Sequence, residues 1–415
     1  MADRAEKSRD AGPRSDEGWR GDKLKQKIAF IYIDSGGGHR AAANALCEVI
    51  RREERPWDLQ MFCIQELLDP IDFIRKSTGI PFQDVYNIML RRGWTLGSAQ
   101  LIPLMHVVIR LCHGQQVAAL ERHWRRYRPD LVVSLIPHYN RALKQALDGV
   151  WPGTPYVTIL TDMADYPPHF WMERQDQYVI CGSARAAEQA HALGLAESRI
   201  LRTSGMILHP KFYEPLYLDR AAERTRLGLQ PDLPTGLVLF GGEGSMEMVR
   251  IAERLNRPDS GIQLILLCGK HAQAARELRA MTPRIPMFVE GFTRDIPFYM
   301  ELADFFIGKP GPGSISEALA KGLPVIVQRN AWTLAHERYN ADWVEEQQAG
   351  VVVRGFSGIF DAVKKLLEPE CYRRYRRRAV ETSNRAVYEI PPLLDEILVE
   401  ARERPAPAPE PVLAN

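Results

Sequence analysis

Residues 308–319 read GKPGPGSISEAL, and they indicate the fold more strongly than any other part of the chain. The apolar run 303–307 before them predicts a buried strand, and the glycines allow a tight turn into a helix that Gly313 and Ser314 open. Glu317 follows Ser314 by three residues, which is the spacing of a capping box. A glycine-rich turn at a helix start also attracts anions, because free N–H groups and the positive end of the helix dipole converge there. We therefore expect a phosphate at this turn.

Two other loops repeat the pattern of an apolar run followed by glycines. DSGGGHR at 34–40 follows the run 28–33 and precedes a helical pattern over 41–52, and FGGEGS at 240–245 ends the run 237–240. None of the three is the phosphate loop of nucleotide hydrolases, because no Gly-Lys-Ser/Thr follows. One such loop is a weak signal, and a single doubly wound domain remains an alternative. Because each half of the chain opens on such a loop, we predict an α/β fold of two Rossmann-like domains that face a shared cleft.

Size and composition support two soluble domains. A chain of 415 residues is too long for one compact core, and its contents of 45% hydrophobic and 26% charged residues are typical of soluble globular proteins. The net charge of +2 argues against a nucleic-acid partner. The six cysteines are scattered without a C-x-x-C pair, which favours free thiols in a reducing cytoplasm over disulfides or a zinc site. No apolar stretch approaches the roughly 20 residues of a membrane span, and the charged N-terminus lacks an apolar signal core.

The order of apolar runs and helical patterns divides the chain. We predict strands at 28–33, 131–136, 156–161, 177–181, 237–240, 263–268, 286–290, 304–307, 324–328 and 351–353, and a last long helical stretch over 359–400. The expected parts are a disordered tail (1–22), an N-terminal Rossmann-like domain (23–205), a hinge rich in proline (206–234), a C-terminal Rossmann-like domain (235–368), further helices (369–403) and a Pro/Ala-rich disordered tail (404–415).

Residues 66–128 differ from the rest, because large apolar side chains alternate with arginines that few acidic residues oppose. One interpretation is a set of ordinary amphipathic helices packed on the first domain. The other is a surface that rests on an anionic membrane through apolar side chains and basic contacts, each worth about 1 kcal/mol. The two interpretations can hold for different parts of the segment.

Several polar residues follow predicted strands, at the ends where α/β proteins bind ligands. His39 comes one step after Gly38 at a helix start, where the helix dipole disfavours an imidazolium, so a neutral ring could act as a general base. Its alternative role is a structural histidine beside a tight turn. His138 and Asp162 could orient a substrate hydroxyl on the acceptor side, and Asp165 could too, although each aspartate could instead stabilise a turn.

In the second half, Glu317 could either cap its helix or accept hydrogen bonds from the two hydroxyls of a ribose. Residues 336–340, HERYN, offer further polar groups after the strand 324–328, and their alternative role is a solvated helix start. The sequence shows no His/Cys/Asp cluster with the spacing of metal ligands and no Gly-x-Ser-x-Gly elbow.

The motifs together resemble a known family. Residues 35–41, SGGGHRA, resemble the amino-terminal signature of monogalactosyldiacylglycerol synthases and the processive diacylglycerol glucosyltransferases, which belong to glycosyltransferase family 28. Further motifs occur in the order that this family has them: GGEG at 241–244, CGK at 268–270, GF at 291–292, KPGPGSISEAL at 309–319 and GLP at 322–324. The resemblance runs from about residue 27 to 355 and is specific because the motifs occur in combination.

This resemblance implies a GT-B fold, with two Rossmann-like domains around a cleft and a last helix that crosses back to the first domain. It implies an inverting hexose transfer from a UDP-sugar to a lipid alcohol, diacylglycerol in the first place, without a metal and without a cofactor, since the UDP-sugar is a substrate. It also implies a cytoplasmic enzyme that associates peripherally with the inner face of the cell membrane, with an anionic lipid surface as partner. The resemblance would make 23–205 the acceptor and membrane-docking domain, with 66–128 as its docking part, 235–368 the UDP-sugar-binding domain, and 369–403 the crossing-back helices.

The resemblance also assigns roles to residues. His39 would be the catalytic base or a partner to it. The diphosphate would lie among glycines and serines of the loops, Phe292 would present its backbone to uracil, Glu317 would hold the ribose and Glu337 would contact the sugar. The full set of implied donor contacts is Gly38, Gly242, Gly244, Ser245, Phe292, Thr293, Pro312, Gly313, Ser314, Glu317, His336 and Glu337.

The sugar motif departs from the family pattern. His336 stands where glutamine is usual, Tyr339 replaces a small residue, and Pro310 stands where alanine usually follows Lys309. The sequence therefore leaves the hexose open, and to a lesser degree the acceptor. A UDP-sugar epimerase and an inactive sugar-nucleotide-binding protein are the alternative functions. A dinucleotide oxidoreductase is the weakest, because no Gly-x-Gly-x-x-Gly is present.

Overall fold

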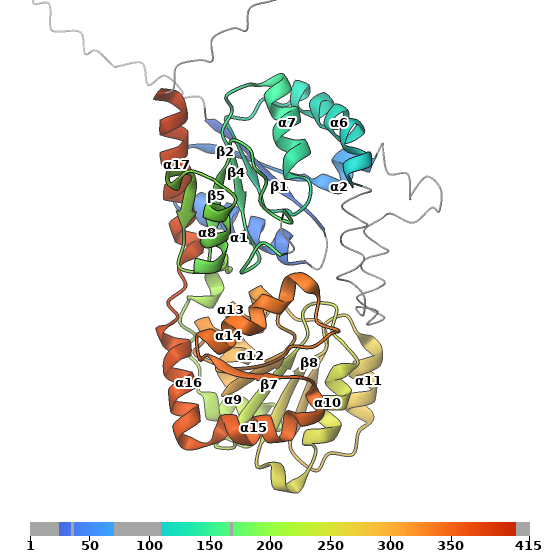
Figure 1. The fold of residues 1–415 in the computed structure, drawn as a ribbon. Helices are drawn as coiled ribbons and strands as arrows, with labels where there is room; N and C mark the ends of the chain where they lie inside the picture. Colours follow the sequence, from blue (N-terminus) through green and yellow to red (C-terminus); the bar gives the residue numbers. More distant parts are fainter. Residues whose placement is uncertain (1–24, 35–36, 70–108, 167–168, 404–415) are drawn as a thin grey trace, which may run out of the picture.

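The computed structural model describes residues 25–34, 37–69, 109–166 and 169–403, and it shows two lobes stacked one above the other (Figure 1). Each lobe contains a six-stranded sheet in which all neighbouring strands run parallel. The predicted α/β fold of two Rossmann-like units is confirmed. The predicted tails over 1–22 and 404–415, and 70–108 within the basic apolar segment, lie outside the described residues.

The sheet of the N-terminal lobe has the strand order β2-β1-β3-β4-β5-β6. Its elements are β1 (Gln26–Tyr32), α1 (Gly38–Arg52), β2 (Trp57–Cys63), α2 (Ile64–Leu68), α6 (His113–Arg126), β3 (Leu131–Ser134), α7 (Asn140–Val150), β4 (Tyr156–Ile159), β5 (Tyr178–Cys181), α8 (Ala184–Ala192) and β6 (Ile200–Arg202). The three central strands β3, β4 and β5 are buried along their whole length, as parallel strands covered by helices on both faces must be.

The sheet of the C-terminal lobe has the order β12-β11-β10-β7-β8-β9. Its strands are β7 (Thr235–Leu239), β8 (Gln263–Leu267), β9 (Met287–Glu290), β10 (Phe305–Gly308), β11 (Val325–Gln328) and β12 (Gly350–Val353). Its helices are α9 (Arg220–Arg226), α10 (Glu247–Leu255), α11 (Ala272–Ala280), α12 (Ile296–Leu302), α13 (Pro312–Ala320), α14 (Arg338–Glu346), α15 (Ile359–Leu367) and α16 (Pro369–Glu381).

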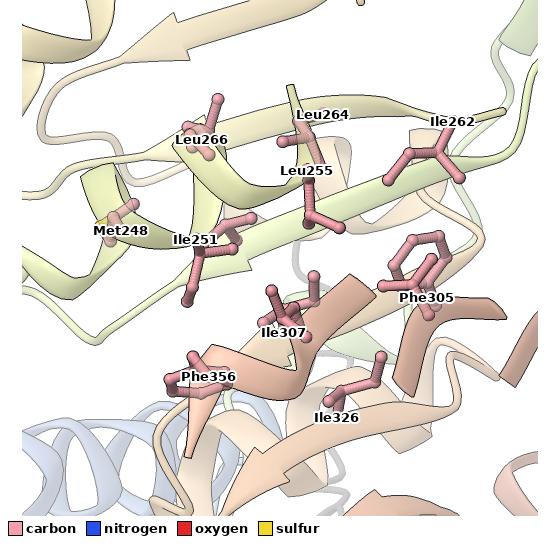
Figure 2. Close-up of a cluster of buried hydrophobic side chains, with 14 of the residues drawn as sticks. Met248, Ile251, Leu255, Ile262, Leu264, Leu266, Phe305, Ile307, Ile326 and Phe356 are labelled. Atoms are coloured by element: carbon pink, nitrogen blue, oxygen red, sulfur yellow. The ribbon is translucent and has the colours of Figure 1, made fainter. Parts of the chain in front are cut away.

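One hydrophobic core of the C-terminal lobe lies between this sheet and helices α10 and α15 (Figure 2), and a second lies between the sheet and α12, α13 and α14. Helix α10 repeats apolar residues at the spacing of one helical face, so Ile251 and Leu255 both point at the sheet. They meet Leu264 of β8 and Ile307 of β10, and all four side chains are fully buried. Burial of each such side chain is worth about 1.5–3 kcal/mol, so this packing fixes the strands whose carboxyl ends carry the loops of interest.

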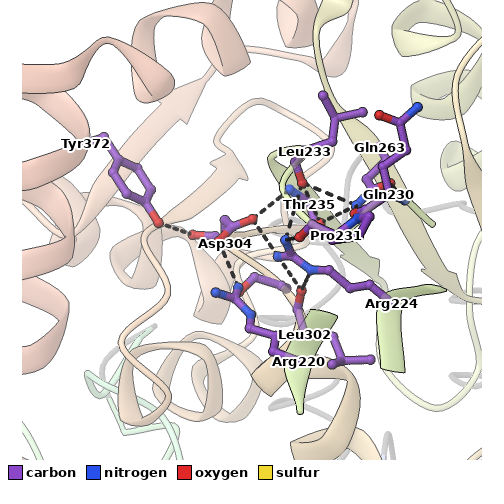
Figure 3. Close-up of polar contacts among 11 residues, drawn as sticks. Arg220, Arg224, Gln230, Pro231, Leu233, Thr235, Gln263, Leu302, Asp304 and Tyr372 are labelled. Atoms are coloured by element: carbon purple, nitrogen blue, oxygen red, sulfur yellow. Dashed lines mark hydrogen bonds and ion pairs between the residues drawn. The ribbon is translucent and has the colours of Figure 1, made fainter. Parts of the chain in front are cut away.

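A charge network closes the opposite edge of the same sheet, at the amino ends of its strands (Figure 3). Asp304, just before β10, accepts hydrogen bonds from Arg220 and Arg224 at 2.7 Å each and from the Thr235 backbone N–H at 2.8 Å. Arg224 is 4% exposed and also donates to the Leu302 carbonyl at 3.0 and 2.7 Å. The network therefore fastens α9 to the sheet far from the carboxyl ends of the strands, which is a structural role.

The chain ends in three helices rather than the single stretch predicted over 359–400. Pro369 occupies the first turn of α16, where a missing N–H is tolerated, and the chain breaks again before α17 (Ala386–Glu403). Helix α17 packs Ile390 and Leu394 against α1 and the sheet of the N-terminal lobe (Figure 1). The predicted crossing back of the last helix is confirmed.

Residues 206–234, predicted as a hinge, connect the two sheets and include α9. The chain passes between the lobes a second time before α17, and the two passages are joined. Asn384 donates to the Met206 carbonyl at 2.8 Å, and the Ser204 hydroxyl accepts from the Arg385 N–H at 2.6 Å. The exact domain boundaries and a hinge motion stay predictions.

Candidate active site

Both sheets reverse their strand order at one point, and the glycine-rich loops lie there. In the N-terminal lobe the reversal separates β1 from β3, and in the C-terminal lobe it separates β7 from β10. Ligands of open α/β sheets bind in the crevice outside the carboxyl ends of such strands. The loops and helix starts after these four strands contain His39, His138, Gly241–Ser245 and Lys309–Gly313. The structure thus brings the predicted site loops to the two switch points.

His39 is the second residue of α1, and its ring is oriented through Nδ1. This nitrogen lies 3.0 Å from the Leu135 carbonyl oxygen and 3.0 Å from the Thr161 hydroxyl. Because a carbonyl only accepts, Nδ1 carries the proton, and Nε2 is left with a free lone pair. Gly37, with φ of 81°, makes the left-handed turn that starts this helix. The arrangement gives the ring the tautomer that a general base at Nε2 needs.

The protonation state of His39 also suits a base. Burial lowers its pKa to about 4, and the charge of His336 lowers it further, while the hydrogen bond to Leu135 acts the other way. This lowered pKa favours the neutral ring that the sequence predicts. Its main cause is burial, however, and not the helix terminus on which the expectation was based.

The two aspartates after β4 have different surroundings. Asp162 is 6% exposed and accepts a hydrogen bond from the indole Nε1 of Trp171 at 2.9 Å, and burial raises its pKa. The charges of His336 and Lys309 from the other lobe partly oppose this rise, so Asp162 faces the gap between the lobes. Asp165 instead accepts a hydrogen bond from the backbone N–H of Trp171 at 2.6 Å. This bond corresponds to the second role considered for the aspartates, which is to stabilise a turn.

His138 follows β3 and takes part in the same wall. Its backbone has a φ of 70°, and its N–H donates to the Phe170 carbonyl at 2.7 Å. The rings of His138 and Phe170 meet edge to face, with centroids 4.2 Å apart. Trp171 then lies beside His39, with ring centroids 5.6 Å apart. His39, His138 and Asp162 are therefore parts of one wall of the N-terminal lobe, with two aromatic residues between them.

In the C-terminal lobe, two glycine-rich loops come unusually close to other backbone. A Cβ on Gly244 would lie 2.1 Å from the Cys268 carbonyl, and Gly244 has a φ of 70°, so glycine is required there. The Ser245 hydroxyl accepts the Glu247 N–H at 3.1 Å at the start of α10. Gly242 lies in the same loop, and a Cβ on Gly269 would come within 2.3 Å of its carbonyl. Glycines thus set the shape of this loop.

Helix α13 begins earlier than predicted. It starts at Pro312 with Gly311 as its N-cap, and no side chain caps it, so the predicted capping box of Ser314 and Glu317 is wrong. Proline fits the first helical position because its backbone angle is already helical and it has no N–H to satisfy. Gly313 and Ser314 remain in the first turn, where N–H groups lack partners within the helix. The N-cap therefore lies three residues before the predicted one, and the anion site at this helix start stays a prediction.

Glu317 lies on α13 beyond its first turn, so its alternative role as a capping residue is excluded. Burial raises its pKa to about 7, and the charge of Lys211 opposes the rise. Phe292 is 56% exposed after β9, and the Thr293 hydroxyl accepts the Asp295 N–H at 3.0 Å. The nucleotide contacts inferred for these residues stay predictions.

Lys309 and Glu337 form an ion pair between the loops. Lys309 Nζ lies 2.8 Å from Glu337 Oε1, and the lysine stem would lie 3.9 Å from a Cβ on Gly241 and 3.5 Å from one on Gly311. Burial would raise the pKa of Glu337, but Lys309 and then His336 outweigh it, and the pKa is lowered. Asn340 fastens the sugar motif by donating to the Pro310 carbonyl at 2.9 Å.

The two halves of the site meet at an aromatic pair. The ring of His336, from the 3₁₀ turn η5 (Ala335–Glu337), stacks on Phe170 of the other lobe with centroids 5.3 Å apart and planes at 13°. The charge of His336 also acts on His39 and on Asp162. Of the predicted donor residues, His336 therefore lies close to the wall that contains His39 and Asp162.

Sequence reasoning missed the residues that join the predicted ones. Thr161 and Trp171 orient His39 and Asp162, while Phe170 and Lys309 make the contacts described above. Thr161 is the last residue of the predicted strand 156–161 and Lys309 lies two residues after the predicted strand 304–307, and that position was the signal available for them. The two aromatic residues carry no such signal, because their place depends on how the loop after β4 folds.

Comparison with known proteins agrees with this arrangement. Residues 237–387 match the family model of the glycosyltransferase family 28 C-terminal domain. A probable chloroplastic monogalactosyldiacylglycerol synthase 2 of Oryza sativa subsp. indica is 30% identical over 349 residues, which cover 79% of this chain and 70% of that protein.

Two solved structures resemble the whole chain in shape. Acinetobacter baumannii MurG has a TM-score of 0.57 at 13% identity, covering 90% of this chain and 99% of that one. MnaA of S. aureus, solved with UDP, has a TM-score of 0.58 at 15% identity, covering 92% and 100%. At these identities the likeness concerns the fold alone, and the expected GT-B fold is confirmed.

Proposed function

The chain belongs to the monogalactosyldiacylglycerol synthase family and is a UDP-sugar-dependent glycosyltransferase, and from this premise we propose that it transfers a hexose to the hydroxyl of diacylglycerol with inversion at the anomeric carbon. One observation carries the proposal. A histidine whose lowered pKa favours the neutral ring, and whose Nε2 has no hydrogen-bond partner among the described residues, lies at the switch point of one lobe close to His336 in the sugar motif of the other.

His39 acts as the general base in this proposal. Its Nε2 takes the proton from the acceptor hydroxyl as that oxygen attacks the anomeric carbon from the face opposite the nucleotide. The bond between the anomeric carbon and the UDP oxygen breaks, and the electron pair leaves with UDP. The Leu135 carbonyl, 3.0 Å from Nδ1, holds the ring and stabilises the imidazolium that forms.

The C-terminal lobe stabilises the leaving diphosphate without a metal in this proposal. The first turn of α13 directs N–H groups from Gly313 and Ser314, and Lys309 adds a positive charge between the two glycine-rich loops. Fixed donors of this kind stabilise developing negative charge without reorganisation. We expect Lys309 to exchange part of its contact with Glu337 for the diphosphate. Transfer should then persist unchanged after treatment with EDTA, and a loss of activity that Mg²⁺ restores would contradict a metal-free reaction.

The remaining donor contacts follow the order of the loops. The exposed loop of Phe292 and Thr293 binds the uracil, and Glu317 accepts hydrogen bonds from the ribose hydroxyls. His336 and Glu337 bind the hexose. A buried ring nitrogen of His336, Nδ1, has no hydrogen-bond partner among the described residues, which suits contact with a sugar hydroxyl. The hexose is left to experiment, because histidine stands where the family has an amide.

Membrane contact is part of the proposal. Within the described part of 66–128, helix α6 packs Leu120 and Trp124 into the core, as an ordinary amphipathic helix does. Its outer face exposes Arg122, Arg125 and Arg126, which suits an anionic surface. No helix in the part of the chain that the structure describes has the length and apolar character needed to cross a membrane. We propose peripheral attachment at the inner face of the cell membrane.

A transfer assay tests the function. Purified protein is mixed with vesicles of diacylglycerol and anionic lipid and, in separate tubes, with radiolabelled UDP-galactose, UDP-glucose or UDP-N-acetylglucosamine. Label that enters the organic phase from one donor supports the proposal and identifies the hexose. Conversion of the UDP-sugar without lipid would indicate an epimerase instead. UDP binding without any turnover would indicate an inactive binding protein.

A further inference from the structure

The stack of Phe170 on His336 connects the two halves of the site. Phe170 is 6% exposed and belongs to the loop after β4 in the N-terminal lobe, while His336 belongs to η5 in the C-terminal lobe. The two rings lie nearly parallel, at 13°, with centroids 5.3 Å apart. A contact of this geometry resists both sliding and separation of the surfaces that carry it.

On the N-terminal side, the stack continues to the proposed base. The Phe170 carbonyl accepts the His138 N–H at 2.7 Å, so the backbone that carries the ring is fixed to the loop after β3. The next residue, Trp171, lies beside His39 at 5.6 Å between ring centroids and donates to Asp162 at 2.9 Å. A displacement of Phe170 would therefore shift Trp171 and, through it, the side chains of His39 and Asp162.

On the C-terminal side, the stack continues to the loops that are proposed to hold the diphosphate. His336 is followed by Glu337, whose carboxylate pairs with Lys309 at 2.8 Å. Asn340, one turn further along α14, donates to the Pro310 carbonyl at 2.9 Å. The position of His336 is thus fixed to the loop after β10.

We propose that the Phe170–His336 stack sets the spacing between the lobes, and that both are positioning residues that hold the donor loops at the right distance from His39. The expected effect on hexose transfer rests on the proposed function, whereas the docking of one lobe on the other is independent of it. The alternative is that His336 acts only through the hexose contact proposed above, by way of its ring nitrogen Nδ1, and that the stack has no part in docking. That role needs no aromatic ring, so ring and nitrogen can be separated by substitution.

Three variants separate them. His336→Phe keeps an aromatic ring and removes the nitrogens, His336→Gln keeps polar atoms and removes the ring, and Phe170→Leu keeps apolar volume without an aromatic face. Amide hydrogen exchange of His138 and Trp171 reports the N-terminal wall without any need for turnover. UDP affinity by calorimetry and kcat for transfer complete the measurement, and the Val132 amide in β3 serves as the control for global unfolding.

We expect His336→Gln, a change in one lobe, to speed exchange at His138 and Trp171 in the other lobe, and Phe170→Leu to do the same. Both should lower kcat about three- to tenfold, the worth of one aromatic pair, with UDP affinity changed less than twofold. His336→Phe should keep wild-type exchange. If Phe170→Leu fails to fold, His336→Gln decides the question alone, because its ring is only partly buried.

The results separate this inference from the proposed function. Wild-type exchange at His138 and Trp171 in His336→Gln would overturn the docking role. So would normal kcat in His336→Gln together with a loss in His336→Phe, which would assign His336 to hexose contact through its nitrogen. If the wild-type protein transfers no sugar, the proposed function fails, but the exchange rates still decide whether the stack docks the lobes.

Discussion

The acid limb of the activity profile tests the environment of His39. Burial lowers its pKa to about 4, from an ordinary value near 6.5. At pH 5.5 a ring with the lowered value is about 97% neutral, whereas an ordinary histidine is about 9% neutral. We therefore expect kcat/KM at pH 5.5 to stay close to its value at pH 7. A base with an ordinary pKa would lose about tenfold over the same interval.

The assay is initial-rate transfer of radiolabelled hexose into diacylglycerol vesicles between pH 4 and 8. The effect on stability has a definite sign, since the unfolded state binds the His39 proton more readily between pH 4 and 6.5, and stability falls as pH falls through that window. Circular dichroism at each pH therefore checks that the protein stays folded. A limb centred near pH 6.5 in folded protein would refute the assignment of a partly buried, neutral His39 as the base.

Three other changes test the fold and the donor site. Asp304→Ala should lower the free energy of unfolding by about 3 kcal/mol in denaturant titrations, because it leaves Arg224 buried without its carboxylate. The control Asp259→Ala, in an exposed pair, should cost at most about 1 kcal/mol, and equal effects would contradict the structural role of the network. Gly244→Ala should destabilise the C-terminal lobe and weaken UDP binding measured by calorimetry. At the control position Gly261, φ is 62° but the space around the residue is open, so Gly261→Ala should lower stability through backbone strain and leave UDP affinity unchanged. Glu317→Gln should weaken UDP binding about three- to tenfold at pH 8. It should also abolish the rise of UDP affinity with pH around 7, because the raised pKa means that the Glu317 carboxyl ionises only near that pH. Identical pH curves for the variant and the wild type would argue against a ribose contact.

The strands that surround the site could be predicted because they are apolar on both faces. β3, β4, β7, β8 and β10 are buried along their length, and each predicted run matches within two or three residues. The edge strands β2 and β6 were not predicted. β2 alternates polar and apolar residues and is half exposed, and β6 has only three residues, so neither stands out as a continuous apolar run.

Within the site, what could be predicted followed directly from position after a strand. His39, His138 and Asp162 lie at carboxyl ends of strands, and the structure places them in one wall. The start of α13 was misplaced because a serine followed by a glutamate suggested a cap, while Pro312 already provides the first helical position. The stack of Phe170 on His336 depends on two loops from different lobes, and no local pattern in either encodes it.

The most direct test of the account is replacement of His39 by alanine. Transfer of labelled hexose to diacylglycerol should fall by roughly 10²–10⁴-fold, the usual worth of a general base, while UDP affinity by calorimetry stays near that of the wild type. Thr161→Val is the matched control, because it removes one contact of the ring and keeps the Leu135 hydrogen bond that sets its tautomer. A His39→Ala protein that transfers hexose at nearly the wild-type rate would contradict the central claim that His39 is the base.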